Sequence, residues 1–293
     1  MAPKAKECPR PISDGVLAGM VATVVTHPLD VLKVRLQVSP ARCTTLHLAI
    51  LLVKYEGFRG LSCGLTAGLL RQATYTATRL SVYDMLYRNY MRDNARGPSR
   101  TDKLWFGIYS GLCGGLVGNP SELVLVRRIV EGCQRTPPPG VTCCRCPCSY
   151  FGTIDAFKKI ICVDGFSGLL RGATLTLLRS VVLSTVYVGG YDRIIDYVKC
   201  QTKEKDPFIV RVSAAIAMSF IAAVLSSPID VVKTFYQASR CDDETYKETL
   251  QYIIRCRGYR ALWKGFAPYF TRMAIHTIVA FIVLDRLADN AVK

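Results

Sequence analysis

The chain has 293 residues, of which 50% are hydrophobic, and its formal net charge is +16. Because such a charge favours an anionic partner, the partner classes to separate are nucleic acid, anionic lipid and anionic small molecules. The mean hydropathy of +0.23 is high for a soluble protein and low for a typical membrane bundle, and residues 1–12 contain three prolines and no apolar core, so we expect no signal peptide.

The sequence predicts a long helix, a short helix and a long helix, three times in succession. Two of the long segments contain uncharged runs, 104–121 and 212–229, that are about the minimum length for crossing a bilayer. Charges inside such helices usually face protein or a water-filled cavity, so the pattern favours helices around a wet interior. The expected helices are 12–38, 45–55 and 67–92 in the first third, 103–132, 153–163 and 175–198 in the second, and 208–238, 247–256 and 268–290 in the last.

The first long helix of each third contains a proline, followed two residues later by an acid. The pairs are Pro28 and Asp30, Pro120 and Glu122, and Pro228 and Asp230. A proline inside a helix removes one N–H donor and its ring clashes with the preceding turn, so we expect a kink at each. Three equivalent kinks would tilt three helix ends towards a common axis.

A glycine followed seven residues later by an arginine marks the second long helix of each third. The pairs are Gly64 and Arg71, Gly172 and Arg179, and Gly265 and Arg272. A threefold repeat decides the architecture before any local propensity does. The distance from proline to glycine is longest in the middle third, which therefore contains an insertion. The predicted repeats are 1–98, 99–203 and 204–293, with a Pro/Cys-rich loop insertion at 133–150.

Four cysteines lie close together in this insertion: Cys143, Cys144, Cys146 and Cys148. Two of them form a CxxC pair, but four zinc ligands within six residues would make a strained tetrahedral site. We therefore expect no metal there. The cysteines are interpreted as reducible loop thiols or as part of an insertion without chemistry.

The repeated arginines form the candidate binding site. By the threefold repeat, Arg71, Arg179 and Arg272 are expected at one level of a central cavity, where they would favour a multiply charged anion. A planar guanidinium suits a carboxylate because it donates to both oxygens. Tyr75 and Arg79 share the face of Arg71, since residues four apart lie on one side of a helix. The alternative for each arginine is an anchor to a carbonyl or a lipid phosphate.

The residues around the prolines resemble the signature of the mitochondrial carrier family, in which a base follows the acid by three residues. The matching bases are Lys33 and Lys233, and Gln37 and Gln237 follow at a common offset. The resemblance covers essentially the whole chain. It implies an all-α fold, namely a pseudo-threefold bundle of six transmembrane helices with three short matrix helices, in the mitochondrial inner membrane. Both termini would face the intermembrane space, and one central site would open to either side in turn.

The same resemblance implies a matrix gate in which ion pairs join the three kinked helices. Leu125 stands where the third base is expected, so Asp30 is expected to remain solvated or to find Arg127 or Arg128. The alternative is that these charges only cap or solvate helix ends. The two remaining implied pairs are Glu122 with Lys233 and Asp230 with Lys33.

A second gate is implied on the cytosolic side, where the family has an aromatic residue, an acid and a base on each of the other long helices. The base is missing from all three helices, so we expect this gate to be thin. The residues at the aromatic and acidic positions are Tyr83 and Asp84, Tyr191 and Asp192, and Leu284 and Asp285.

Two family motifs imply binding of a lipid, cardiolipin. Tyr150-Phe-Gly152 resembles the aromatic-x-glycine motif and, with Arg171 and Gly172, is expected to bind a lipid phosphate through helix N-terminal amides. Lys264 and Gly265 form the corresponding basic–glycine pair of the third repeat.

Within the family, segments 67–80, 122–127 and 264–277 are most similar to the 2-oxoglutarate/malate carrier branch. His276 lies one turn after Arg272 and either tunes the pH dependence of the cavity near neutrality or is a hydrogen-bonded packing residue. The branch implies a role in transport for Arg71, Tyr75, Arg79, Arg179 and Arg272.

The sequence thus predicts a monomeric antiporter, without a cofactor, that exchanges small dicarboxylates such as 2-oxoglutarate for malate. The nearest alternatives are a di- or tricarboxylate or phosphate exchanger of broader specificity and an uncoupling-type proton-leak carrier. A third class is a membrane scaffold without transport. No catalytic constellation or phosphate-binding glycine loop is visible, so we expect no enzyme, and a nucleic-acid binder would not explain the kinked apolar helices.

Overall fold

The computed structural model describes residues 12–39, 44–94, 97–135, 150–202, 207–239 and 245–292, in which the order long helix, short helix, long helix occurs three times. Within these ranges every regular element is helical, which confirms the all-α class. The long helices are α1 (Ile12–Val38), α3 (Leu65–Asp93), α4 (Arg100–Arg135), α6 (Ala173–Thr202), α7 (Pro207–Ala238) and α9 (Phe266–Val292). The short ones are α2 (Thr45–Leu61), α5 (Thr153–Gly168) and α8 (Tyr246–Arg257), the last followed by the 3-10 helix η1 (Tyr259–Trp263).

The helix bounds follow local signals closely. The first long helix has the predicted bounds, whereas α2 and α5 extend beyond their predicted ends, past Gly57 and Gly165. These glycines have φ values of 65° and 70°, so each interrupts its helix without ending it. Such left-handed angles are accessible to glycine because it lacks a Cβ. Thr245 and Glu248 form a capping box that starts α8. The 3-10 helix η1 was not predicted.

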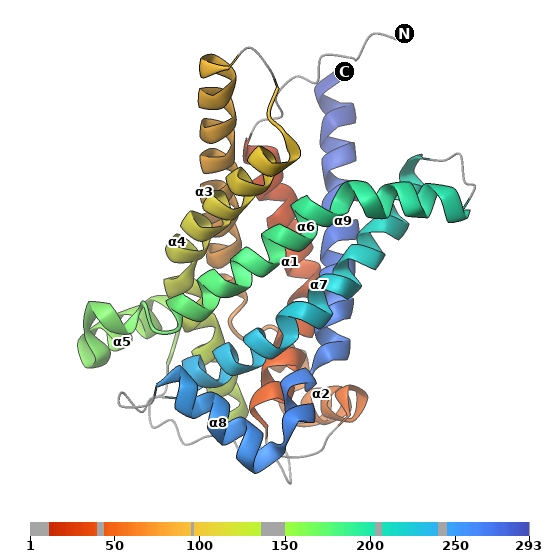
Figure 1. Cartoon of the computed structure of the whole chain (residues 1–293). Coiled ribbons are helices and arrows are strands. Elements are labelled where there is room, and N and C mark those ends of the chain that lie inside the picture. The colour runs from red at the N-terminus through yellow and green to blue at the C-terminus, as the bar shows by residue number, and fades with distance from the viewer. Residues whose placement is uncertain are drawn as a thin grey trace.

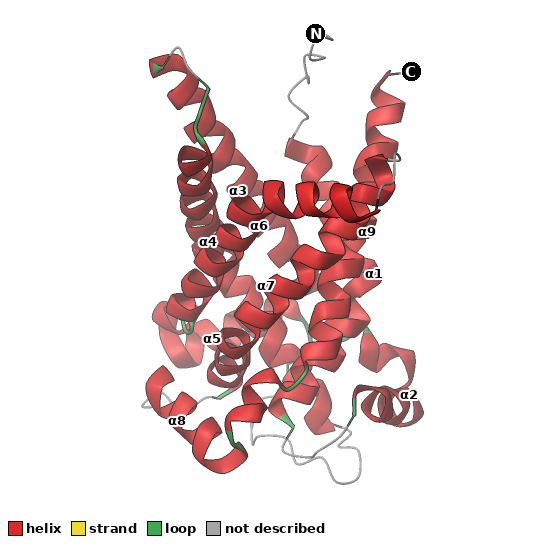
Figure 2. Cartoon of the chain, turned by 45° about the vertical axis from the view of Figure 1, so that its right-hand side comes forward, coloured by secondary structure: helices red, strands yellow, loops and turns green. Residues whose placement is uncertain are grey.

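The long helices form a closed ring. Along the chain, α1 packs on α3, α3 on α4, α4 on α6, α6 on α7 and α7 on α9, and α9 returns to α1. Figure 1 and Figure 2 show α2, α5 and α8 at one end of the bundle, called the short-helix end below. Helix α1 begins and α9 ends at the opposite end, called the terminal end. Pro28, Pro120 and Pro228 lie inside α1, α4 and α7.

Glycines let α3 approach α4 closely. A Cβ on Gly114 would lie 3.0 Å from the carbonyl oxygen of Tyr75, and one on Gly118 would lie 3.3 Å from the Tyr75 Cβ. Contacts that short are tighter than ordinary packing, so larger residues would push the helices apart. The two glycines thereby place Tyr75 at the inner wall of the ring.

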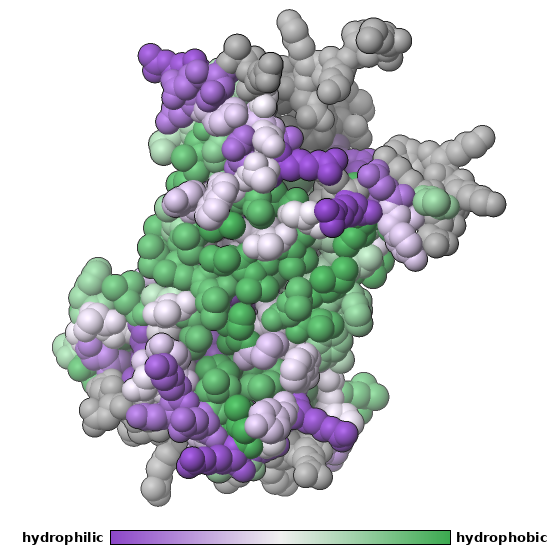
Figure 3. Space-filling model, viewed as in Figure 1, coloured by the Kyte–Doolittle hydropathy of each residue, from purple (hydrophilic) through white to green (hydrophobic). Residues whose placement is uncertain are grey.

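The outer surface of the bundle is apolar around its middle. Figure 3 shows a hydrophobic band between polar ends. On α1 the exposed Leu17, Val21, Val24 and Val25 recur with the spacing of one helix face. Among the described residues, four segments are long and apolar enough to cross a membrane: Ile12–Val38, Ala173–Gly190, Val210–Ala238 and Tyr259–Leu287. These faces point away from the ring and leave its polar residues inside.

Candidate functional site

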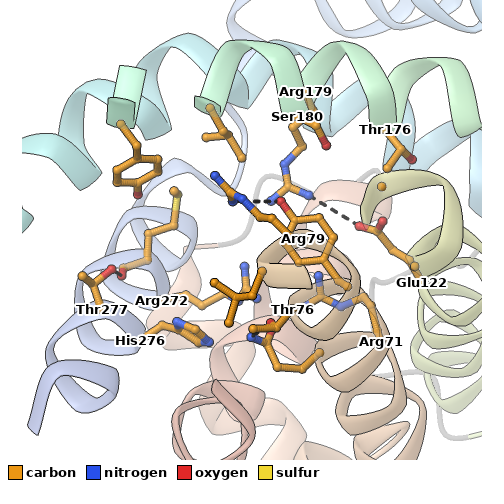
Figure 4. A pocket seen from close by; sticks show the side chains of 18 residues that line it. Arg71, Thr76, Arg79, Glu122, Thr176, Arg179, Ser180, Arg272, His276 and Thr277 are labelled. Atoms are coloured by element: carbon orange, nitrogen blue, oxygen red, sulfur yellow. Dashed lines mark hydrogen bonds and ion pairs between the residues drawn. The ribbon is translucent and has the colours of Figure 1, made fainter. Parts of the chain in front are cut away.

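A cavity of about 480 Å³ lies inside the ring (Figure 4). Its walls come from α3, α4, α6 and α9, whose residues are far apart in the sequence. The structure brings together at this cavity all six residues predicted for substrate binding: Arg71, Tyr75, Arg79, Arg179, Arg272 and His276.

The two cavity arginines of α3, Arg71 and Arg79, have no carboxylate partner in the described part of the chain. Arg79 Nη1 donates to the hydroxyl of Tyr75 at 3.0 Å, one turn earlier on the same face. Arg71 lies deeper, and its buried Nε has no hydrogen-bond partner. Both guanidinium groups line the cavity, so they are placed to receive an anion.

Arg179 of α6 and Arg272 of α9 are bound differently, because acids of the proline-containing helices α1, α4 and α7 already hold them. Arg179 Nη1 lies 3.4 Å from Glu122 Oε1, the pair drawn in Figure 4, and its Nε lies 3.4 Å from Asp230 Oδ1. Arg272 forms an ion pair with Asp30. The three arginines expected at one level therefore line one cavity, but acids hold Arg179 and Arg272, whereas no acid of the described residues holds Arg71.

The partner of Asp30 corrects a sequence expectation. Asp30 is neither solvated nor bound to Arg127 or Arg128, because Arg272 reaches it from α9, which packs beside α1. Arg127 Nη1 instead binds Asp164 Oδ2 at 2.6 Å. Arg128 Nη1 donates to the carbonyl of Tyr150 at 2.6 Å.

The two implied gate pairs are both formed at the short-helix side of the cavity. Lys33 of α1 contacts Asp230 of α7, and Lys233 Nζ lies 2.5 Å from Glu122 Oε2 of α4. Gln37 Nε2 adds a hydrogen bond to Asp230 Oδ2 at 3.3 Å. All of these side chains are largely buried, and a buried ion pair is costly to break by losing one partner. Two ion pairs thus join α1 to α7 and α7 to α4 on this side of the cavity.

Gln237 has a different partner from its counterpart Gln37. Its Nε2 lies 3.5 Å from Asn119 Oδ1 of α4 and 3.4 Å from the carbonyl of Arg171. Gln237 therefore joins α7 to α4 and to the start of α6, rather than contacting a gate acid.

The third side of the gate, between α1 and α4, is apolar. Leu125 and Ile129 are both buried, and Ile129 stands where the other repeats have glutamine. A Cβ on Gly64, which precedes α3, would lie 3.1 Å from Leu125 Cδ1. Packing of these side chains against the α2–α3 turn replaces the ion pair and the glutamine found on the other sides.

Tyr269 of α9 contacts Lys33 and Arg179, and the sequence analysis did not single it out. It is fully buried, its hydroxyl shares a 2.8 Å hydrogen bond with Ser226 Oγ, and Arg179 Nη2 lies 3.4 Å from the same oxygen. Lys33 Nζ lies 3.9 Å from the ring centre. Its position three residues before Arg272, on the same helix face, was the available signal.

The described residues of the predicted cytosolic gate make scattered contacts and no repeated set of ion pairs between helices. Asp84 pairs with Arg88 of its own helix at 2.8 Å, and Asp285 lies 3.9 Å from Arg211 of α7. Tyr83 packs edge-on against Phe106 of α4. Tyr191 and Asp192 belong to α6, but their side chains lie outside the described residues.

The predicted lipid residues fall in different places. Arg171 and Gly172 line a second cavity of about 410 Å³ together with Tyr236 and Tyr246. Its lining does not include Tyr150 or Gly152. Tyr150 is buried, and its N–H donates to Glu131 Oε1 at 2.5 Å.

Two further groups of predicted residues remain. Gly265 adopts a φ of 83°, and a Cβ there would lie 3.2 Å from Gln37 Cγ. Lys264 Nζ contacts the carbonyl of Ser39 at 2.5 Å. The cysteine cluster 143–148 lies outside the described residues.

Positive charge exceeds negative charge around the base of the cavity. Three carboxylates face five cations, and Arg79 adds another further along α3. Because an uncompensated charge is costly away from water, this surplus favours a multiply charged anion. The acids are Asp30, Glu122 and Asp230, and the cations are Lys33, Lys233, Arg71, Arg179 and Arg272.

Comparisons with known proteins find similarity over nearly the whole chain. A family model described as mitochondrial carrier protein matches residues 6–94, 98–201 and 204–293. The chain is 33% identical to the mitochondrial 2-oxoglutarate/malate carrier proteins of Bos taurus and Homo sapiens, over 93% of this chain and 88% of each relative. It is 28% identical to the mitochondrial uncoupling protein 5 of Arabidopsis thaliana, over 94% of this chain and 95% of that protein.

Proposed function

The chain belongs to the mitochondrial carrier family, and we propose that it exchanges small dicarboxylates, such as 2-oxoglutarate for malate, by alternating access. Members of this family are transporters, and the chain is a multi-pass protein of the mitochondrial inner membrane. By the orientation that the family resemblance implies, the short-helix end faces the matrix. The ion pairs on this side of the cavity then form the matrix gate in its closed state.

The observation that supports a dicarboxylate is the pair of arginines on one face of α3. Arg71 and Arg79 lie two turns apart, both line the cavity and neither is held by an acid. One carboxylate on each arginine would satisfy both ends of a short dianion. The 33% identity to 2-oxoglutarate/malate carriers supports the same substrate class.

The two arginines that are paired with acids, Arg179 and Arg272, link substrate binding to the gate. Arg179 and Arg272 are held by gate acids in the closed state, so a bound carboxylate competes with those acids for the same guanidinium groups. Only a ligand that binds the two gated states differently shifts their equilibrium. A dianion that draws these arginines away from the acids would weaken the closed state.

Lipid binding and the monomeric state belong to the same proposal. The cavity at Arg171 and Gly172 lies where α6 begins, and a cation beside helix N-terminal amides suits a phosphate such as that of cardiolipin. One chain closes the ring around the central cavity. We therefore propose that the monomer is the transporting unit.

Exchange assays in liposomes test the substrate. The purified protein is reconstituted into liposomes that contain malate, and the uptake of labelled 2-oxoglutarate, malate, citrate and phosphate into these liposomes is compared. Arg71→Ala and Arg79→Ala are each expected to lower dicarboxylate exchange by roughly tenfold or more, since a hydrogen bond to a charged group is worth about 1.5–3 kcal/mol. Arg92→Ala, at the exposed end of the same helix, is the matched control and should behave as wild type.

Two outcomes would contradict the proposal. Wild-type exchange in both cavity variants would remove the binding site. Proton conductance without dicarboxylate exchange in the wild type would favour the uncoupling alternative. The 28% identity to an uncoupling protein is the reason to test that alternative. A pH-sensitive dye inside the same liposomes measures that conductance.

A further inference from the structure

In repeats 1 and 2, an ion pair joins the proline-containing long helix to the short helix of the same repeat. In the first, Arg35 of α1 donates to both oxygens of Glu56 of α2, at 2.5 and 2.8 Å. In the second, Arg127 of α4 donates to Asp164 of α5 at 2.6 Å. Each arginine lies seven residues after the helix proline, and each acid directly precedes a glycine of positive φ. The two pairs are therefore equivalent.

The third repeat departs from this arrangement at both positions. Phe235 stands where the arginine belongs, and Arg257 stands where the acid belongs, directly before Gly258. The Arg257 guanidinium carbon lies 4.6 Å from the centre of the Phe235 ring. A cation–π contact uses the face of the guanidinium and leaves its N–H donors available for other acceptors.

Arg257 uses these donors on the carboxyl end of α1. Its Nη1 donates to the carbonyls of Ser39 at 3.0 Å and Gln37 at 3.4 Å, and its Nη2 donates to the carbonyl of Val38 at 3.4 Å. Lys264 contacts the same Ser39 carbonyl. The last carbonyls of a helix lack partners within the helix and form the negative end of its dipole, so cations are favourable there.

This contact crosses the boundary between repeats 3 and 1, close to the gate. Gln37 belongs to this contact and to the gate. Its carbonyl accepts a hydrogen bond from Arg257, and its side chain donates one to Asp230, which forms the ion pair with Lys33. For the short-helix end to open, the carboxyl end of α1 has to separate from repeat 3. The arginines of repeats 1 and 2 join helices of one repeat, whereas Arg257 joins two repeats that separate.

We propose that Arg257 is a positioning residue of the gate. It holds the carboxyl end of α1 against α8 and thereby keeps the Lys33–Asp230 pair closed until substrate opens it. The inference concerns the gate alone and is independent of which anion is carried.

A cysteine behind the gate reports its opening without any substrate. Thr234 of α7 is buried one turn beyond Asp230 and lines the small space at the gate, so a Thr234→Cys background reacts with a small maleimide only when the gate opens. A protease that cleaves after arginine releases this position in the peptide 212–240, or in the peptide 212–235 where Phe235 is replaced by arginine, and neither peptide contains a native cysteine. The native Cys63 competes poorly for the reagent, because burial raises the pKa of its thiol.

Three variants in this background separate positioning from general stability. Arg257→Gln removes the contact with α1. The double change Phe235→Arg with Arg257→Glu also removes it, but restores within repeat 3 the ion pair found in repeats 1 and 2. Arg255→Gln removes the same charge from an exposed position of the same helix and is the matched control.

Arg257→Gln is expected to raise the rate at which the introduced thiol at position 234 is labelled several-fold, and Arg255→Gln to leave that rate unchanged. The double variant is expected to melt at a temperature closer to that of the parent than the single variant does, while its labelling stays fast. An unchanged labelling rate in Arg257→Gln would overturn the proposal. So would a double variant that recovers slow labelling together with stability, because Arg257 would then act only within its own repeat.

Discussion

At the scale of single residues, the gate of this chain is asymmetric because one base is missing. Leu125 takes the place of that base, and Asp30 is held by Arg272 instead. The consequence is that a cavity arginine serves the gate in the closed state. On the other two sides, lysines hold the acids, so only the α1–α4 side relies on packing of Leu125 and Ile129.

Adding the missing base should tighten this side. Leu125→Lys is expected to slow dicarboxylate exchange in liposomes by about fivefold, the effect of ~1 kcal/mol, because a lysine there gives Asp30 a partner on α4 and stabilises the closed state. Leu125→Met, similar in volume and uncharged, should exchange near the wild-type rate. Equal exchange rates for the lysine and methionine variants would show that no such pair forms.

At the scale of elements, the beginning of each inner helix is built around one glycine. Gly64, Gly172 and Gly265 have φ values of 83°, 79° and 83°, and each starts a helix that bears a cavity arginine seven residues on. Gln237 packs over Gly172, and Gln37 packs over Gly265. The left-handed turn therefore sets both the direction of the helix and the space for the glutamine.

Gly172→Ala should destabilise the protein through both effects. A left-handed angle costs an L-residue roughly 1–2 kcal/mol, and the new Cβ would lie 3.0 Å from Gln237 Cγ. We expect a melting temperature several degrees below that of the wild type in a thermal shift assay of the detergent-solubilised protein. Gly97→Ala, whose Cβ would meet nothing within 4 Å, is the control, and an equal shift in both variants would contradict the explanation.

At the scale of the whole molecule, the apolar and charged residues are separated by direction. On the face shown in Figure 3, apolar side chains cover the middle of the bundle between polar ends, while the charged residues of the cavity and the gate face the interior of the ring. This explains why a chain with a net charge of +16 and a mean hydropathy of only +0.23 is a membrane protein. Charge inside the ring lowers the mean hydropathy without exposing polar groups to lipid.

Membrane extraction tests this separation directly. Because the apolar band contacts lipid, washing membranes with concentrated salt or with alkaline carbonate is expected to leave the protein in the pellet, and detergent is expected to release it. A peripheral protein held by its positive charge would be released by salt alone, since salt screens interactions between exposed charges. Release in the salt wash would therefore contradict the bundle as the membrane-spanning unit.

Local spacing was enough to predict much of this protein. The bounds of α1 were predicted without error. The glycine–arginine spacing predicted that Arg71, Arg179 and Arg272 lie at one cavity, and all three line it. Such features depend on helix periodicity and on a repeat, which are written in neighbouring positions. The all-α class and the residues that line the central cavity could therefore be predicted from the sequence, whereas Tyr269 and the partner of Asp30 could not.

Which charged side chains form ion pairs depends on how the helices pack against one another in three dimensions. Asp30 and Arg272 are more than 240 residues apart, and their pairing depends on α9 closing the ring against α1. The contact of Arg257 with the end of α1 likewise joins residues from the third and first repeats. A guanidinium binds whichever acceptor packing brings within about 3 Å. Those distances are set by helices packing across repeats and by no pattern within one of them.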